Sequence, residues 1–501
     1  MTFIRNSIKL MVGVLLASSV AFLAVNAEEA AKPAPEPFAF ETKHQGTFGG
    51  KRVNYTATVS NLMLKRGNGD VYAEAVTIAY VMDKADKRRP VTFVFNGGPG
   101  GASVLLHMGV MSPKHVPVPT DGGDTGLAPY QIQDNPAAML DITDLVFIDP
   151  IGTGYSRLAG TGKPEDVYGL EEDARSVSDI IREWVRVNNR WNAPKYIAGE
   201  SFGTTRAAAM MPYLQGGAEP MRINGLIMVS QAMDYTGSTP VPDNMLAHVT
   251  YLPTLAATAR YHGKLANSSS DLASFMDEVR AFAVDEYLPA LFRGSSLEEG
   301  EENRIAVKLA GYTGLNIDYI KRAKLRILTG RFRKELLRDT GEIVGSLDGR
   351  YKSKDLDGVG ASARFDVSSN AVGAAYTPAF REYLRNDLGV TLERPYYSSG
   401  PDVTANWVYD RSSGYNEPSY VNTAPQLADA MVKNPSLRVL VASGYYDLIT
   451  PFLDAEYTIA RHGIDTSRVT MTYYEAGHAM YVNEDAFDAL IKDMRAFIAS
   501  E

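Results

Sequence analysis

The sequence predicts an α/β fold, a mainly parallel central sheet covered by helices on both faces, with antiparallel N-terminal edge strands. Short apolar runs of strand length alternate with amphipathic stretches of helical spacing, as in βαβ units. Near the N-terminus the strand-like stretches alternate apolar and polar residues, which is typical of antiparallel strands with one exposed face. Residues 232–395 break the alternation and predict an inserted helical cap.

The N-terminus has the features of a secretory signal peptide. Arg5 and Lys9 precede an apolar run over residues 10–25, and small residues lead to a cleavage position after Ala27. The run is about 16 residues long, shorter than the ~20 of a membrane-spanning helix, which favours cleavage over an uncleaved anchor. We expect residues 1–27 to be removed and the mature protein to be periplasmic or secreted, without membrane attachment.

Composition narrows the classes of partner and cofactor. The chain has 501 residues, a formal net charge of −9, 45% hydrophobic residues and no cysteine. Its negative charge argues against a nucleic-acid partner, and its length allows a large core to replace disulfides. An exported chain without cysteine fits a bacterial protein better than a eukaryotic one. No H-E-x-x-H or paired-cysteine pattern is present, so we expect no metal and no cofactor.

The first part of the mature chain predicts a leader followed by edge strands. Residues 28–40 are rich in proline and alanine, which favours a flexible, extended leader. Residues 53–59 and 72–80 alternate as strands do, and the turn signal Arg66-Gly67-Asn68-Gly69-Asp70 lies between them. We expect these strands to form one edge of the sheet.

Continuous apolar runs predict the buried strands, and helical stripes predict the layers that cover them. Residues 170–188 place Val177, Ile181 and Trp184 on one helix face, and residues 484–499 repeat this pattern. The strand candidates are residues 91–95, 143–148, 195–198, 223–229, 437–442 and 469–474.

The pattern G-x-S-x-G occurs at Gly199-Glu200-Ser201-Phe202-Gly203, directly after a strand-like run. It forms the tight turn from strand to helix that raises a serine hydroxyl above the sheet of an α/β-hydrolase. Glycine is needed on both sides because such a turn leaves no room for Cβ atoms. The small residues 204–210 predict a helix packed close to the strand, so Ser201 is the predicted nucleophile.

A nucleophilic serine needs a base and a group that orients the base. His478 lies on the loop after the strand candidate 469–474, and Asp447 lies just beyond the strand candidate 437–442. The order Ser201, Asp447, His478 is the order found in α/β-hydrolases. The sequence therefore predicts a catalytic triad.

A glycine-rich loop, Asn96-Gly97-Gly98-Pro99-Gly100-Gly101, follows the apolar run 91–95. Such a loop exposes backbone N–H groups, which an oxyanion hole requires. The alternative of a phosphate-binding loop is rejected because Pro99 lacks an N–H and neither G-x-x-x-x-G-K-[ST] nor G-x-G-x-x-G is present.

The cap predicted over residues 232–395 lies between nucleophile and acid. It divides the core into a first part, residues 41–231, and a second part, residues 396–501. We expect the cap to cover the site and to shape the pocket for the substrate side chain.

Together these motifs resemble the serine carboxypeptidases, a family with the α/β-hydrolase fold. The resemblance rests on Asn96-Gly97-Gly98-Pro99-Gly100, Gly199-Glu200-Ser201-Phe202-Gly203, Asp447 and Gly477-His478, with Asp149-Pro150-Ile151-Gly152-Thr153-Gly154-Tyr155-Ser156 as a further signature. It extends from about residue 93 to the C-terminus, apart from a middle part without a match.

The resemblance implies a role for each matching residue. Ser201 is the implied nucleophile, His478 the general base and Asp447 the residue that orients it. The backbone N–H groups of Gly98 and Phe202 are the implied oxyanion hole. The implied ligands of a peptide's C-terminal carboxylate are Asn96, the Gly97 backbone and Glu200, and a protonated Glu200 is able to donate to that carboxylate.

The chain departs from the family in several places near the site. Gly101-Ala102 stand where many relatives have cysteine and serine, and Val110 falls where many place a second acidic residue. Asp149 stands where glutamine is usual, and the loop after His478 has one residue more before Met480. These changes affect recognition of the substrate's end group and the pH profile rather than the triad.

The leading hypothesis is an exported serine carboxypeptidase that acts on peptides with a free C-terminus through an acyl-enzyme. An esterase or an acyltransferase on the same scaffold is the alternative enzyme. A binding protein that kept the fold and lost the chemistry is the alternative outside enzymes. The preferred C-terminal residue and the oligomeric state have no legible signal in the sequence.

Overall fold

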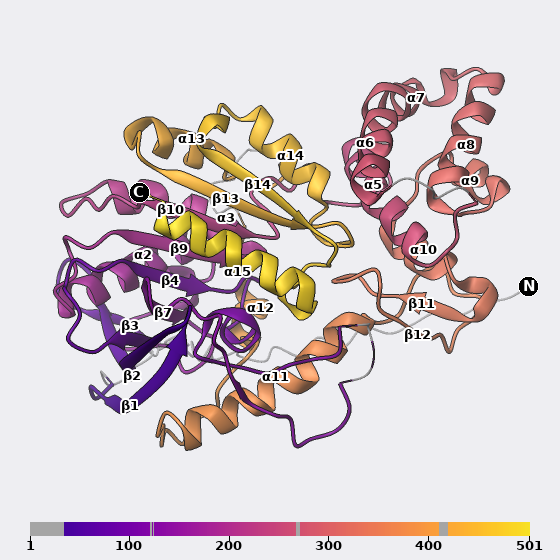
Figure 1. The fold of residues 1–501 in the computed structure, drawn as a ribbon. Coiled ribbons are helices and arrows are strands. Elements are labelled where there is room, and N and C mark those ends of the chain that lie inside the picture. The colour runs from indigo at the N-terminus through magenta and orange to yellow at the C-terminus, as the bar shows by residue number, and fades with distance from the viewer. Residues whose placement is uncertain (1–34, 121–122, 124, 267–270, 410–418, 501) are drawn as a thin grey trace, which may run out of the picture.

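The computed structural model describes residues 35–120, 123, 125–266, 271–409 and 419–500, arranged around one large sheet (Figure 1). The predicted signal peptide, residues 1–27, and residues 28–34 of the predicted leader lie outside the described residues. Within the described part of the chain, no helix is long and apolar enough to cross a membrane.

The central sheet has ten strands and the topology of an α/β-hydrolase. Its first three strands and the β3–β7 pair are antiparallel, and every neighbouring pair from β7 to β14 is parallel. The predicted fold class is therefore confirmed. In sheet order the strands are β1 (Ala39–Phe48), β2 (Lys51–Lys65), β3 (Val71–Met82), β7 (Asp144–Asp149), β4 (Val91–Phe95), β9 (Lys195–Glu200), β10 (Gly225–Val229), β13 (Arg438–Gly444) and β14 (Val469–Tyr474), and β8 (Arg157–Leu158) pairs with β3.

The N-terminal edge of the sheet has a further strand, β1, before the two strands that the alternating pattern predicted. β1 begins at Ala39, which pairs with Ser60, so the predicted leader is wrong in its last two residues. Polar residues such as Lys43 and Gln45 interrupt the apolar alternation, because β1 is an edge strand that is exposed or half-buried over most of its length. The predicted core strands agree with the structure to within two residues at each end.

Helices cover both faces of the sheet (Figure 1). Alternation along β4 shows the two layers, since Phe93 and Phe95 point into one buried cluster and Val94 into the other. The first cluster packs against α2 (Leu170–Val187), α3 (Phe202–Ala209), α4 (Met211–Gln215), α13 (Ala424–Lys433) and part of α14 (Phe452–Arg461). The second packs against α1 (Val104–Leu106), the π-helical turn η1 (His107–Met111), α11 (Val367–Asn386) and α15 (Glu484–Ala499).

In the described part of the segment predicted as a cap, the helices that precede α11 lie beside the sheet, at the right of Figure 1. They pack around a third buried cluster, which also includes Phe452 of α14. The helices are α5 (Met245–Tyr261), α6 (Leu272–Phe282), α7 (Leu288–Arg293), α8 (Glu299–Thr313), α9 (Ile317–Arg322) and α10 (Thr329–Glu335). The boundaries of the core and cap given above stay predictions.

After α10 the chain returns to the sheet through the hairpin of β11 (Glu342–Val344) and β12 (Lys352–Lys354) and then through α11. The segment after α11 crosses the glycine loop, where Gly101 bridges to Ser399, and continues into α12 (Pro401–Asn406). A small sheet pairs β5 (Lys114–His115) with β6 (Gln133–Asp134). Short helical turns complete the described elements: η2 (Pro164–Asp166), η3 (Ala283–Tyr287), η4 (Gly294–Ser296), η5 (Arg338–Thr340), η6 (Thr466–Arg468) and η7 (Met480–Val482).

Candidate active site

Ser201 occupies a strained turn between β9 and α3. Its φ of 58° and ψ of −128° lie in a region that non-glycine residues rarely adopt. The turn is held in place because the Ser201 N–H donates to the carbonyl of Val229 on the neighbouring strand, at 3.0 Å. This is the geometry that G-x-S-x-G predicts, with the serine at the carboxyl edge of the parallel strands.

The glycines of the turn are required by close backbone contacts. A Cβ atom on Gly199 would lie 2.5 Å from the carbonyl oxygen of Gly203, and one on Gly203 would lie 3.1 Å from that of Phe95. Gly97 meets the same turn from the glycine loop, since its Cβ would lie 2.5 Å from the amide nitrogen of Phe202. Glycine at these positions therefore lets the two loops touch through their backbones.

Asp447 and His478 form a buried pair at the ends of β13 and β14. The Nδ1 of His478 lies 2.7 Å from the Oδ2 of Asp447. Asp447 also accepts the N–H groups of Ile449 at 2.8 Å and Thr450 at 3.0 Å, and the Thr450 hydroxyl at 2.6 Å. Four donors thus fix the carboxylate, and the carboxylate in turn fixes the orientation of the imidazole.

The histidine loop is also held from the cap side by the β11–β12 hairpin. The His478 N–H donates to the carbonyl of Leu347 at 2.6 Å, and the Gly477 N–H donates to Asp348 Oδ2 at 3.1 Å. From the sheet side, the Ser230 hydroxyl donates to the His478 carbonyl at 2.7 Å. His478 is therefore positioned by residues from both the core and the inserted segment.

Burial and Asp447 act in opposite directions on His478. Burial lowers the pKa of the imidazole, but the adjacent Asp447 carboxylate, through its charge and its hydrogen bond, raises it, and the net pKa is above the usual 6.5. The pair thus stabilises an imidazolium, which is the form that His478 takes after it accepts a proton.

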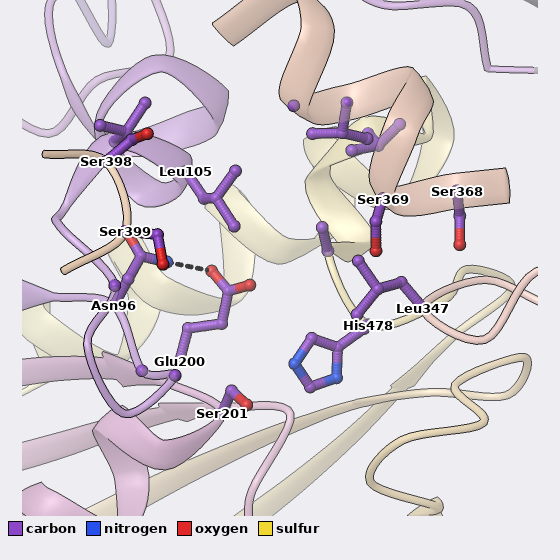
Figure 2. A pocket seen from close by; sticks show the side chains of 18 of the residues that line it. Asn96, Leu105, Glu200, Ser201, Leu347, Ser368, Ser369, Ser398, Ser399 and His478 are labelled. Atoms are coloured by element: carbon purple, nitrogen blue, oxygen red, sulfur yellow. Dashed lines mark hydrogen bonds between the residues drawn. The ribbon is translucent and has the colours of Figure 1, made fainter. Parts of the chain in front are cut away.

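Ser201 and His478 line one cavity of about 330 Å³, and Figure 2 shows the hydroxyl and the ring on the same side of it. No hydrogen bond joins these two described residues. Catalytic hydrogen bonds are often long in substrate-free enzymes and shorten when the substrate binds.

The glycine loop borders the same cavity. Gly98 has a φ of 120°, which favours glycine, and both Gly97 and Gly98 line the cavity. The first N–H groups of a helix have no partner within the helix, so the N–H of Phe202 at the start of α3 is free to bind a ligand oxygen. The amides of Gly98 and Phe202 are the groups that the sequence predicts as an oxyanion hole.

Glu200 is a buried carboxyl group beside the nucleophile. Its Oε2 accepts hydrogen bonds from Asn96 Nδ2 at 2.9 Å, drawn in Figure 2, and from the Tyr481 hydroxyl at 2.8 Å. Burial raises the pKa of Glu200 to about 7, and the nearby His478 and these two donors offset only part of that increase. Near neutral pH this residue is therefore able to hold or release a proton.

The rest of the cavity is apolar with a set of hydroxyl groups. Asp348 lies at its wall and is paired with Arg350 at 2.6 Å. Among the described residues that line the cavity there is no Lys or Arg. Apolar lining comes from Val104, Leu105, Leu347, Tyr351, Val372, Ala479 and Val482, and hydroxyls come from Ser368, Ser369, Thr377, Ser398 and Ser399.

Three supporting contacts were missed at the sequence level: Thr450 on Asp447, Tyr481 on Glu200, and the Leu347 carbonyl with the Asp348 carboxylate under the histidine loop. Tyr481 and Thr450 lie three residues after His478 and Asp447, and this proximity is the only signal that the sequence offers. Leu347 is distant in sequence and has none.

Two departures from the family have a local structural account. Val110 is fully buried in η1 and does not line the cavity. Asp149 is buried, accepts the N–H and the hydroxyl of Ser103, and accepts the Tyr396 hydroxyl at 2.9 Å. Asp149 therefore acts as an acceptor that ties β7 to the glycine loop and to the segment after α11.

Within the described part of the chain, no cluster of three or more His, Cys, Asp or Glu residues is arranged to hold a metal ion.

Comparisons with known proteins agree with the motifs. The profile of the serine carboxypeptidase family matches residues 78–219, a region that includes the glycine loop and the Ser201 turn and ends before Asp447. A serine carboxypeptidase-like protein 51 from Arabidopsis thaliana is 28% identical over 156 residues, which cover 30% of this chain and 31% of the relative. The match thus spans about a third of that relative's length.

Solved structures are similar at a low level. A soluble variant of monoglyceride lipase from Saccharomyces cerevisiae is 12% identical, with a TM-score of 0.36 over 93% of this chain and 98% of that chain. A putative aryl esterase from Burkholderia cenocepacia is 11% identical, with a TM-score of 0.33 over 87% of this chain and 97% of that chain. At these TM-scores the solved structures give no support for the fold beyond the sheet topology described above. The resemblance to the serine carboxypeptidases is confirmed over residues 78–219.

Proposed function

We propose that this protein is an exported serine carboxypeptidase, which removes C-terminal residues from peptides through an acyl-enzyme. The observation that carries the proposal is one cavity lined by Ser201 on its strained turn, by His478, and by Glu200 with Asn96, while Asp447 holds His478 through a hydrogen bond. Ser201, His478 and Asp447 supply acyl-transfer chemistry, and Glu200 and Asn96 supply recognition of an end group.

Acylation begins when His478 accepts the Ser201 proton and the Ser201 Oγ attacks the scissile carbonyl carbon. The developing oxyanion is stabilised by the N–H groups of Gly98 and Phe202. The C–N bond then breaks, and the imidazolium gives its proton to the leaving amine. In deacylation His478 takes a proton from water as the water oxygen attacks the ester carbonyl carbon. The C–O bond to Ser201 then breaks, the imidazolium returns its proton to Ser201 Oγ, and the shortened peptide leaves as a free acid.

Recognition of the substrate's free carboxylate falls to neutral donors, because the described lining of the cavity has no Lys or Arg. Glu200 in its protonated form donates one hydrogen bond to the carboxylate, while its ionised form repels it. The Asn96 amide orients Glu200, and the Gly97 backbone borders the same place. Loss of the Glu200 proton therefore weakens binding of free acids.

Export follows from the N-terminal sequence, which precedes the described residues. A basic start, an apolar run and a cleavage position after Ala27 support a periplasmic or secreted mature protein of bacterial type. N-terminal sequencing of protein from the producing cell is expected to begin near Glu28, and an intact residue 1–27 segment in the membrane fraction contradicts export by cleavage.

The activity is tested by comparing a free-acid peptide with its C-terminal amide and with a simple ester. Purified mature protein is incubated with an N-blocked dipeptide, with its C-terminal amide, and with a simple ester, and kcat/KM is measured for each. We expect the free acid to be preferred and Ser201→Ala to abolish all three reactions and labelling by a serine-directed phosphonate. Preference for the ester contradicts the carboxypeptidase and favours an esterase, and labelling that survives Ser201→Ala contradicts the nucleophile.

A further inference from the structure

Tyr481 donates a hydrogen bond to Glu200 and is not among the described residues that line the cavity. It belongs to η7, three residues after His478, and only 4% of its surface is exposed. Its ring packs over Gly109 of η1, where a Cβ atom would lie 2.3 Å from Tyr481 Cε2. The absence of a side chain at Gly109 therefore makes room for a tyrosine that reaches Glu200.

The two hydrogen bonds to Glu200 are both made to the same oxygen. Asn96 Nδ2 and the Tyr481 hydroxyl donate to Oε2, at 2.9 Å and 2.8 Å. Oε1 accepts no hydrogen bond from a described residue, and Glu200 lines the cavity. An oxygen that already accepts two hydrogen bonds is a poor place for the acid proton, so the proton of neutral Glu200 belongs on Oε1.

We propose that Tyr481 is a positioning residue that keeps the acid proton of Glu200 on Oε1, facing the substrate carboxylate, and sets the pH at which that proton is lost. This inference rests on the carboxypeptidase function proposed above. It assigns the pH limit of end-group recognition to a hydroxyl that never touches the substrate.

Several titratable groups act on Glu200. Burial and the charge of Asp447 raise its pKa, whereas His478 and the hydrogen bonds from Tyr481 and Asn96 lower it. Tyr376 of α11 belongs to the same buried hydrophobic cluster as Tyr481, and burial and the charge of Glu200 contribute to its raised pKa, but no hydrogen bond joins it to Glu200. Asp348 at the cavity wall is paired with Arg350. Burial and the charge of Glu200 raise the pKa of Tyr481 itself well above 10, so its hydroxyl stays a donor throughout the working range.

The sign of the effect follows from these contacts. The Tyr481 hydroxyl stabilises the ionised form of Glu200, because a carboxylate accepts its hydrogen bond more strongly than a neutral acid does. Tyr481→Phe removes that donor and keeps the ring over Gly109. The pKa of Glu200 then rises, so Glu200 stays protonated and binds free acids to a higher pH.

The experiment measures kcat/KM against pH for a free-acid dipeptide and for its C-terminal amide, with parent, Tyr481→Phe and Tyr376→Phe. We expect Tyr481→Phe to move the alkaline limit of free-acid hydrolysis upward by about one pH unit, mainly through KM, with the alkaline side of the amide profile unchanged. Tyr376→Phe makes the same chemical change beside Glu200 and is expected to leave the limit in place. In a Glu200→Gln background, which has no ionising group there, the shift is expected to vanish.

A second readout does not depend on activity. The C=O stretch of the Glu200 carboxylic acid, identified by its loss in Glu200→Gln, is titrated by infrared difference spectroscopy, and its midpoint is expected to rise in Tyr481→Phe. Thermal unfolding confirms that each variant folds. Equal midpoints in parent and Tyr481→Phe overturn the inference, as does an equal shift in Tyr376→Phe. A parent that does not prefer free acids contradicts the proposed function, while the infrared midpoint still decides the role of Tyr481.

Discussion

Two buried carboxyl groups flank His478, and the structure holds them in opposite ways. Glu200 ends β9 and Asp447 follows β13, and neither is more than 2% exposed. Asp447 accepts four hydrogen bonds shared between both of its oxygens. Glu200 accepts two, both on Oε2, and presents its other oxygen to the cavity.

The comparison shows that the number of donors, rather than burial, separates the two roles. Four donors bind both oxygens of Asp447, which holds the carboxylate in one orientation against the imidazole. Two donors on one oxygen compensate only part of the cost of burial, and the pKa of Glu200 accordingly lies at about 7. One carboxyl group is suited to orient a base, and the other to exchange a proton with its surroundings.

Asp447→Asn gives the largest expected effect and tests the fixed member of the pair. The amide keeps the shape but presents an N–H where His478 needs an acceptor, so the imidazole takes the wrong tautomer. We expect kcat to fall by about 10⁴-fold on free acids, amides and esters alike. A loss confined to free acids would assign Asp447 to end-group recognition and contradict the comparison.

The residues that the sequence predicted are those whose surroundings are local. Gly199 and Gly203 are dictated by the turn itself, and the apolar runs on either side of it fixed β9 and β10 to within two residues. Asp447 and His478 were located because the ends of parallel strands meet at one edge of a sheet. Such features need only a few consecutive residues to be recognised.

A negatively charged side chain on the substrate tests the charge of the cavity as a whole. Glu200 lines the cavity, and Asp348 at its wall is paired with Arg350. The described lining has no Lys or Arg, and its other walls carry apolar side chains and hydroxyl groups. A substrate with Asp or Glu next to the scissile bond buries an unpaired charge there. We expect its kcat/KM at pH 7 to be roughly 10–100-fold below that of a leucine analogue. Equal rates would show that the side chain does not enter this cavity.

Glu200→Gln has a smaller effect that depends on pH. The parent loses its Oε1 proton as the pH rises through about 7, whereas the Gln amide donates at every pH. On free-acid peptides the ratio of variant to parent kcat/KM is expected to rise about tenfold between pH 6 and pH 8, mainly through KM. The amide of the same peptide serves as the control, and an equal ratio for both forms contradicts carboxylate binding by Glu200.

The same variant also changes the acid side of the profile. The charge of Glu200 contributes to the raised pKa of His478. Its removal lowers the pKa of the imidazole, so neutral His478 persists to lower pH and the acid limit moves down for every substrate. The acid limit thus reports His478 and its coupling to Glu200, whereas the alkaline limit for free acids reports Glu200 itself.

The features that the sequence did not predict depend on contacts between distant segments. The Leu347 carbonyl accepts a hydrogen bond from the His478 N–H, more than a hundred residues further along the chain. The Tyr481 hydroxyl donates to Glu200, which is also distant in sequence. Short polar contacts of this kind leave no periodic pattern, because each depends on how segments far apart in the chain pack together. The substrate specificity of the cavity was not predictable for the same reason, since hydroxyl groups of α11 and of the segment after it line its walls.

The smallest expected effect comes from Thr450, which completes the set of donors on Asp447. Its hydroxyl donates to Oδ2 at 2.6 Å and lies 3.2 Å from His478 Nδ1.

Thr450→Val keeps the branched shape and removes one donor to the carboxylate, while the backbone N–H groups of Ile449 and Thr450 still hold Oδ1. We expect kcat to fall about three- to tenfold at every pH and equally for free acids and esters. This is less than the whole of the about 1.5–3 kcal/mol that a hydrogen bond to a charged group contributes, because His478 retains the rest of its support. Thr450→Ser retains the hydroxyl and is expected to restore most of the rate. A shift of the alkaline limit for free acids in Thr450→Val, without a change in kcat, would mean that the two carboxyl groups share one network and that their separation by donors is wrong.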